Sequence, residues 1–172
     1  MATDVTMNYH PLPSPIGTLL LVGNASGIAS IPFATSKRPA SVEPTWVAAE
    51  RPFQSAIAQL EEYFAGRRRA FELALIPTGT AFQQSVWREL QAIPYGTSVS
   101  YAELASRVGK PTAFRAVGAA NGANPWPIVV PCHRVIGSDR SLTGFGGGVE
   151  VKRALLRLEA EVSGAAWLDP KR

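Results

Sequence analysis

Cysteine and histidine are both scarce in this chain of 172 residues. It contains one cysteine, Cys132, and two histidines, His10 and His133. A single thiol excludes an intramolecular disulfide, and one thiol with two distant imidazoles excludes a cysteine-rich zinc site. We therefore expect no metal, and Cys132 must act alone or with non-metal neighbours.

The sequence also lacks long apolar runs, and we expect no targeting segment. Its longest apolar candidate, "IGTLLLVG", has the length of a strand and falls short of the ~18 residues that span a bilayer. The opening "MATDVTMNYH" has no basic segment followed by an apolar one, so we predict no signal peptide, no membrane association and a cytoplasmic location. Charged residues make up 17% and apolar residues 46%, which is typical of one folded domain or two small ones.

Positive charge is concentrated in the second half of the chain. Residues 1–79 contain six Lys or Arg and six Asp or Glu, whereas residues 80–172 contain eleven and seven, so the whole net charge of +4 belongs to the C-terminal half. On charge alone two interpretations remain open. One is an ordinary basic surface, and the other is a site for a polyanion such as nucleic acid.

Strand-like patterns dominate the first third. "TLLLV" and "GIASIPF" flank the turn-forming "GNAS", and "FELAL" has the alternation of a further strand. Residues 34–52 look like a long loop. Helical spacing then predicts a helix that ends at Gly66, with an apolar face formed by Phe53, Ile57, Leu60 and Phe64. The simplest fold for this region is a small antiparallel sheet with one helix against it.

Helix start signals appear from residue 80 onward. Thr80 and Gln83 have capping-box spacing, as have Ser100 and Glu103. They predict helices over residues 81–93 and 101–108, and a third helix is expected at 113–121 after the turn "GKPT". The last two helices have helix-turn-helix spacing, which fits either a DNA-binding motif or an ordinary helical hairpin.

The expected third helix, "AFRAVGAAN", has almost no side-chain bulk. Such a thin helix suits tight packing against a neighbour, or insertion into a narrow groove with Arg115 as its one long cationic side chain. In the last helix, "VEVKRALLRLEAEV", Glu159 lies on the flank of the apolar stripe. A carboxylate there is solvated unless a buried cation or imidazole faces it. The stripe itself consists of Val151, Leu155, Leu158 and Val162.

Cys132 differs from an ordinary core cysteine in its neighbours, which include His133 and Arg134. A thiol with a pKa of about 8.5 must have that pKa lowered to act as a strong nucleophile near neutral pH, and an imidazole or a cation does this. The imidazole needs an orienting acceptor, for which Glu159 is the best candidate. The residues thus predict a relay of carboxylate, imidazole and thiol.

Several motifs occur together and in order around this site. "PCHRVIG" followed by "LTGFGGG", and preceded by "SYAELA" and "RAVGAANGANP", resembles the O6-alkylguanine-DNA alkyltransferases, also called methylated-DNA–protein-cysteine methyltransferases. The resemblance covers residues 80–163, with a looser match in the N-terminal "SPIG". It implies an α+β protein with two domains. Residues 1–78 would form a ribonuclease-H-like sheet-plus-helix domain, and residues 79–172 a mostly helical, winged-helix-like domain with a helix-turn-helix.

The resemblance also implies roles for individual residues. Cys132 would accept the alkyl group, His133 would deprotonate it through a water, Glu159 would orient the histidine, and Tyr101 would assist the guanine leaving group. Arg115 would fill the space of a nucleotide flipped out through the minor groove, and the other expected DNA contacts are Tyr101, Ala113, Ala116 and Asn121. Asn124 would act as a hinge, and the remaining expected pocket or structural residues are Val135, Gly146 and Pro127.

The implied partner is double-stranded DNA that carries alkylated bases, with O6 of guanine and O4 of thymine as targets and no cofactor. Because a thioether has no hydrolysable bond, each molecule would react once. We expect a monomer and leave assembly along DNA open. Phe145 departs from the tyrosine of many relatives, and the four-cysteine domain of the sensing members is absent.

Two other functions remain to be separated from this one. Alkyltransferase-like proteins bind the same damage without transfer, but they lack the cysteine. A thiol hydrolase built on the same relay would leave the recognition helix without a purpose.

Overall fold

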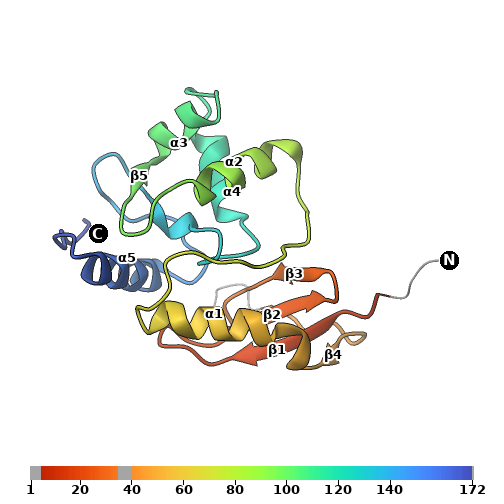
Figure 1. Cartoon of the computed structure of the whole chain (residues 1–172). Coiled ribbons are helices and arrows are strands. Elements are labelled where there is room, and N and C mark those ends of the chain that lie inside the picture. The colour runs from red at the N-terminus through yellow and green to blue at the C-terminus, as the bar shows by residue number, and fades with distance from the viewer. Residues whose placement is uncertain (1–4, 35–39, 172) are drawn as a thin grey trace. The chain divides into compact units, whose positions relative to one another are not determined.

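The computed structural model describes residues 5–34 and 40–171, and the chain forms two compact units, Met1–Pro77 and Thr78–Arg172 (Figure 1). The N-terminal unit contains a four-stranded sheet in the order β3-β2-β1-β4. Its strands are β1 (Asn8–Leu12), β2 (Leu19–Asn24), β3 (Gly27–Ser30) and β4 (Val47–Ala48). Strands β2 and β3 pair antiparallel as expected, whereas β1, which the sequence did not predict, pairs antiparallel with β2. Strand β4 lies in the segment expected to be a loop and runs parallel to β1.

One helix packs on this sheet, as the sequence predicts. The short 3-10 helix η1 (Arg51–Phe53) leads into α1 (Gln54–Phe64). The buried apolar face consists of Phe53, Ala56, Leu60 and Tyr63. It shares Phe53 and Leu60 with the expected stripe, but Ala56 and Tyr63 are buried in place of Ile57 and Phe64.

The expected strand "FELAL" does not form. It makes one isolated bridge between Ile28 and Leu75. The Gln59 side chain instead accepts a hydrogen bond from the Glu72 backbone N–H at 2.8 Å and donates to the Glu72 carbonyl at 3.0 Å. Because these backbone groups are satisfied by a side chain, they are not available to a sheet ladder.

The C-terminal unit is mostly helical. It contains α2 (Ala81–Gln91), α3 (Tyr101–Arg107), α4 (Phe114–Gly122) and α5 (Val149–Ser163), with the 3-10 helix η2 (Cys132–Arg134). The two-residue strands β5 (Val99–Ser100) and β6 (Val135–Ile136) pair parallel. The predicted capping box is complete at Thr80 and Gln83. At the start of α3, Ser100 accepts a hydrogen bond from the Glu103 N–H at 3.0 Å.

Helix α5 buries a different face from the one its apolar pattern predicts. Val151, Leu158 and Val162 are only partly buried. The fully buried residues include two charged ones, Lys152 and Glu159, which are 0% exposed. They are seven residues apart, two turns of helix, so both point from α5 toward the interior of the unit.

The end of the described chain returns to the segment that follows β6. The Leu142 N–H donates to the Lys171 carbonyl at 3.2 Å, and the Lys171 N–H donates to the Arg140 carbonyl at 3.1 Å. Arg153 of α5 pairs with Asp169. Within the described residues, no helix has both the length and the apolarity to cross a membrane.

Candidate active site

Cys132 begins η2, and its residue is 5% exposed. Its N–H donates to the Val130 carbonyl at 2.8 Å, which closes a tight turn just before His133. Asn121, near the end of α4, donates from Nδ2 to the Cys132 carbonyl at 3.4 Å. The recognition helix expected from the sequence is therefore hydrogen-bonded to the backbone of the cysteine itself.

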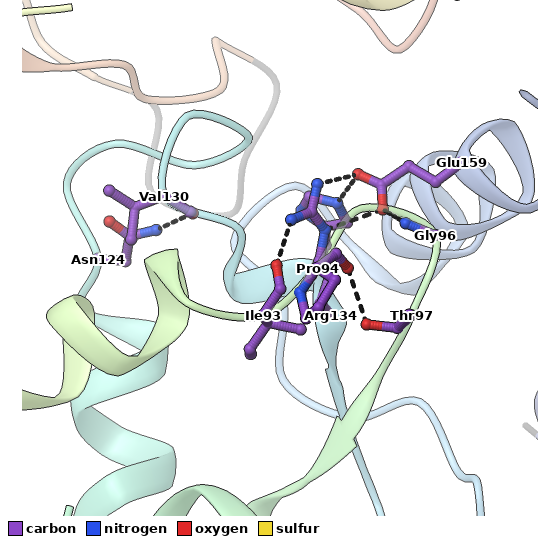
Figure 2. A network of polar contacts seen from close by, with 9 residues as sticks. Ile93, Pro94, Gly96, Thr97, Asn124, Val130, Arg134 and Glu159 are labelled. Atoms are coloured by element: carbon purple, nitrogen blue, oxygen red, sulfur yellow. Dashed lines mark hydrogen bonds and ion pairs between the residues drawn. The ribbon is translucent and has the colours of Figure 1, made fainter. Parts of the chain in front are cut away.

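A second asparagine shapes the loop between α4 and Cys132. Asn124 Nδ2 donates to the Val130 carbonyl at 2.8 Å (Figure 2). Its Oδ1 accepts from the Trp126 N–H at 3.0 Å. The loop also holds the buried, β-branched Ile128 at a φ of 73°, where such residues are rarely found. Asn124 thus holds the loop between α4 and the cysteine, and its role as a hinge stays a prediction.

Glu159 lies at the centre of a buried hydrogen-bond network (Figure 2). The His133 Nε2 lies 2.7 Å from Oε1, and Arg134 binds both carboxylate oxygens at 2.9 Å. Arg134 donates further to the Ile93 carbonyl at 2.7 Å, and the Gly96 N–H donates to Glu159 Oε2 at 3.1 Å. The carboxylate thus has four donors, two of them from a planar guanidinium.

This network determines which groups are charged. Burial by itself raises the pKa of the Glu159 carboxyl, but His133 and Arg134 outweigh it and hold that pKa well below the usual range. Burial lowers the pKa of His133, and Glu159 only partly opposes this. The resting protein therefore holds an ionised carboxylate paired with Arg134 and a neutral imidazole.

The tautomer of His133 follows from these contacts. Its Nε2 faces a carboxylate that can only accept, so Nε2 carries the proton. Its Nδ1 is buried and has no hydrogen-bond partner among the described residues. A neutral imidazole with a free Nδ1 lone pair is a competent proton acceptor.

Lys152 is a buried charged neighbour of the thiol. It is 0% exposed, and its Nζ donates to the Thr143 carbonyl at 3.2 Å and lies 5.7 Å from the centre of the Tyr101 ring. The Tyr101 hydroxyl donates to the same carbonyl at 3.3 Å. Burial lowers the pKa of Lys152 to about 8, and the neighbouring Cys132 opposes that decrease.

The thiol does not have the lowered pKa that the sequence led us to expect. Burial raises the pKa of Cys132, and this effect exceeds the opposite ones of the Asn124 hydrogen bond and the Lys152 charge. The physical reason is that an apolar surrounding penalises a thiolate more than the nearby cation stabilises it. Cys132 therefore rests as a protonated thiol, and a base must remove its proton during the reaction.

Comparisons with known proteins identify the family of the chain. Residues 81–161 match the family model for the DNA-binding domain of 6-O-methylguanine DNA methyltransferase, and residues 7–77 match the model for its ribonuclease-like domain. The chain belongs to the 6-O-methylguanine DNA methyltransferase family.

Individual relatives are similar over most of their length. The chain is 47% identical to a methylated-DNA–protein-cysteine methyltransferase of Methanosarcina barkeri over 153 residues, which is 89% of this chain and 97% of that protein. Its fold matches the O6-methylguanine methyltransferase of Mycobacterium tuberculosis with a TM-score of 0.82 at 45% identity, covering 91% and 94% of the two chains. A structure of the mycobacterial OGT in complex with DNA matches with a TM-score of 0.84 at 45% identity, covering 90% and 94%.

The residues expected to contact DNA differ in their exposure to solvent. Arg115 and Ala116 are exposed on α4, and Ala113 is half-buried just before it. Asn121 is 2% exposed and is bonded to the Cys132 carbonyl. A side chain that is buried in this way cannot reach a phosphate or a base edge, so we withdraw Asn121 as a DNA contact and assign it to the support of Cys132.

The remaining expected pocket residues lie along the chain on both sides of η2. Val135 is fully buried in β6, where it pairs with Val99, and Pro127 is buried and bridged to Val130. Gly146 is exposed, and an added Cβ there would meet nothing within 4 Å. That open backbone is compatible with the expected contact to a base.

Sequence reasoning missed three residues that complete the site. Arg134 had been noted only as a neighbour of the thiol, and Lys152 and Gly96 had not been singled out. Arginine and lysine are usually exposed because they are charged, and glycine is common in exposed turns. No local pattern therefore distinguishes these three residues from solvated ones. Among the described residues, no group of three or more His, Cys, Asp or Glu side chains is placed to hold a metal ion.

Proposed function

We propose that this protein repairs DNA directly, by moving an alkyl group from O6 of guanine to Sγ of Cys132. The observation that carries the proposal is the buried thiol that directly precedes His133, whose Nε2 is held 2.7 Å from an ionised Glu159. Family membership adds the substrate class, because relatives that are 46–47% identical carry names of this activity. The presence of Cys132 argues against an alkyltransferase-like protein that binds without transfer.

The transfer is a displacement at carbon. The thiol proton passes through a water to His133 Nδ1, and the thiolate electron pair forms the S–C bond while the C–O6 bond breaks. Glu159 stabilises the imidazolium that appears. Lys152 stabilises the negative charge on sulfur before the S–C bond is complete.

The leaving guanine takes up the electron pair of the broken bond and needs a proton. Tyr101 is the donor in this scheme. Burial raises the pKa of its hydroxyl, with the opposing Thr143 hydrogen bond a smaller effect, so the hydroxyl keeps its proton at neutral pH. The imidazolium proton restores the tyrosine, and the overall change moves one proton from the thiol to guanine. The thioether on Cys132 offers water no carbonyl to attack, so each molecule reacts once.

The guanine must leave the duplex to reach a thiol that is 5% exposed. Arg115 is exposed on the thin helix α4, which suits the minor groove, and it fills the space of the rotated nucleotide. O4 of alkylated thymine is a second target of the same chemistry. The protein works as a monomer on alkylated double-stranded DNA in the cytoplasm.

Intact mass spectrometry tests the proposal. After incubation with duplex DNA that contains O6-methylguanine, the wild-type protein should gain one methyl group permanently, in proportion to the lesions supplied. Cys132→Ser should gain none and should bind the duplex with nearly unchanged affinity, because a hydroxyl is similar in size but a far weaker nucleophile. Tight binding without an adduct on the wild type would indicate a lesion-binding protein, and repeated turnover of one protein molecule would indicate a hydrolase.

A further inference from the structure

Phe114 is an exposed aromatic residue at the start of the DNA-binding helix. It is the first residue of α4, and 51% of its surface is exposed. Within the described part of the C-terminal unit, Leu168 is the one other large apolar residue with comparable exposure. Single exposed apolar residues are common on proteins, so its exposure needs a second observation to carry meaning.

That observation is what surrounds Phe114 on α4. Arg115 is the next residue, and the other exposed positions of the helix include Ala116 and Ala119. The rest of the exposed face is therefore nearly flat, and the two long side chains project from its first turn. A helix of this shape can approach a groove closely while only Phe114 and Arg115 reach beyond its surface.

Phe114 does not belong to the buried face of its own helix. The buried side of α4 is made by Val117, Ala120 and Asn121. The residue before Phe114 is Ala113, which gives the helix no side-chain cap, whereas α2 and α3 are capped by Thr80 and Ser100. The beginning of α4 thus lacks the features that stabilise the two preceding helices.

We infer that Phe114 is a second wedge, which inserts its ring into the base step beside the flipped nucleotide while Arg115 fills the vacated position. This inference rests on the proposed function. Apolar side chains that enter the minor groove partly unstack a base step, and an aromatic ring replaces part of the lost stacking. Two adjacent side chains of different chemistry then have separate roles in the opened duplex. The guanidinium replaces the lost base, and the ring keeps the neighbouring base pair open.

The first experiment compares two substrates. Phe114→Ala should slow alkyl transfer from alkylated duplex DNA by about ten-fold or more, by analogy with the loss of one base-stacking contact. It should leave transfer from free O6-benzylguanine unchanged, because a free base needs no flipping. Phe114→Trp should keep most of the duplex rate. Leu168→Ala, which removes a comparably exposed side chain of the same unit, is the matched control and should change neither rate.

The second experiment observes the base step itself. A duplex that carries 2-aminopurine next to the lesion reports unstacking as an increase in fluorescence, and Cys132→Ser keeps the complex unreacted. Adding Phe114→Ala to that variant should remove most of the increase, whereas adding Leu168→Ala should not. The Arg115→Ala variant is expected to lose about ten- to hundred-fold on duplex alone, which gives a scale for the Phe114 effect.

The outcomes separate this inference from the function on which it rests. If the wild-type protein gains no alkyl group from the duplex, the proposed function fails. If the wild type reacts and Phe114→Ala reacts equally fast on both substrates, Phe114 is an ordinary surface residue. Equal losses on duplex and free base would place its effect in the fold or the pocket, and would likewise overturn the wedge.

Discussion

The buried site has two sides that differ in how completely their polar groups are satisfied. On the supporting side, the Glu159 carboxylate receives four hydrogen bonds from His133, Arg134 and Gly96. On the reacting side, His133 Nδ1 and Asn121 Oδ1 are buried without partners among the described residues. The Cys132 thiol and Lys152 there both have pKa values shifted against their charged forms by burial.

This difference indicates how the protein combines a stable fold with a reactive thiol. A satisfied network of buried charges holds its groups in one geometry, whereas unsatisfied groups cost stability and keep their capacity for new bonds. His133 belongs to both sides, since one ring nitrogen is held by Glu159 and the other is free to accept a proton. We expect substitutions on the supporting side to affect stability first, and those on the reacting side to affect the reaction.

The largest effect is expected from breaking the supporting side at Arg134. Arg134→Met leaves Glu159 buried with its main cationic partner removed, which should lower the free energy of unfolding by about 3–5 kcal/mol, as measured by urea denaturation. Because the folded pKa of Glu159 lies below its unfolded value of about 4.3, its contribution is present above that pH and is lost as the pH falls. Glu159→Gln should therefore flatten the loss of stability in acid. A change below ~1 kcal/mol for Arg134→Met would show that the network does not stabilise the fold.

The next effect concerns the carboxylate that holds His133, the residue shared by the two sides. Glu159→Gln keeps the shape of the side chain but removes the charge that stabilises the imidazolium, so transfer should slow by about a hundred-fold. The pKa of Cys132 should rise, and the pH–rate profile should move to higher pH. Transfer to free benzylguanine at a series of pH values measures this. An unchanged profile would leave Glu159 with a structural role alone.

On the reacting side, Lys152→Met should have opposite effects on stability and activity. Removing a buried ammonium should stabilise the fold at pH 7 by about 1–3 kcal/mol, while transfer slows by about ten-fold because the thiolate loses its nearby cation. Between pH 8 and about 10.4 the folded wild type has released a proton that the unfolded chain retains, so its stability rises with pH. The difference between the two proteins should narrow over that range. Thermal unfolding at pH 7 and pH 10 gives the test, and a less stable variant at pH 7 would contradict it.

The smallest effect, on stability, is expected at Gly96, whose backbone lies close to Glu159. Gly96 has a φ of 76°, and an added Cβ would lie 2.9 Å from Ser163 Cβ. Gly109 is the matched control, with a φ of 73° and nothing within 4 Å of an added Cβ. Both alanine variants carry the cost of a left-handed conformation, so Gly96→Ala should be less stable than Gly109→Ala by a further 1–2 kcal/mol, roughly the cost of overpacking. Equal stabilities would mean that the site adjusts to the extra carbon.

Local patterns were sufficient for much of the helical unit. Helix starts at Thr80 and Ser100 depend on hydrogen bonds to residues three positions away, so their signals are contained in a few letters of sequence. The shifted face of α5 could not be found in this way. An apolar stripe assigns charged residues to solvent, whereas Lys152 and Glu159 are buried because distant groups satisfy them. The missing strand at "FELAL" has a similar cause, because the Glu72 N–H donates to the side chain of Gln59, thirteen residues earlier.

The sequence by itself determined the reacting pair, since Cys132 and His133 are adjacent in the chain, and its ordered motifs predicted the family and the fold class. Only the tertiary structure decided how the pair is held and in which protonation state it rests. Gly96 is 63 residues from Glu159, and Arg134 reaches Ile93 across 41 residues. The resting thiol is protonated and the imidazole neutral because burial disfavours both charged forms. Burial is a property of the packed molecule and of no short stretch of its chain.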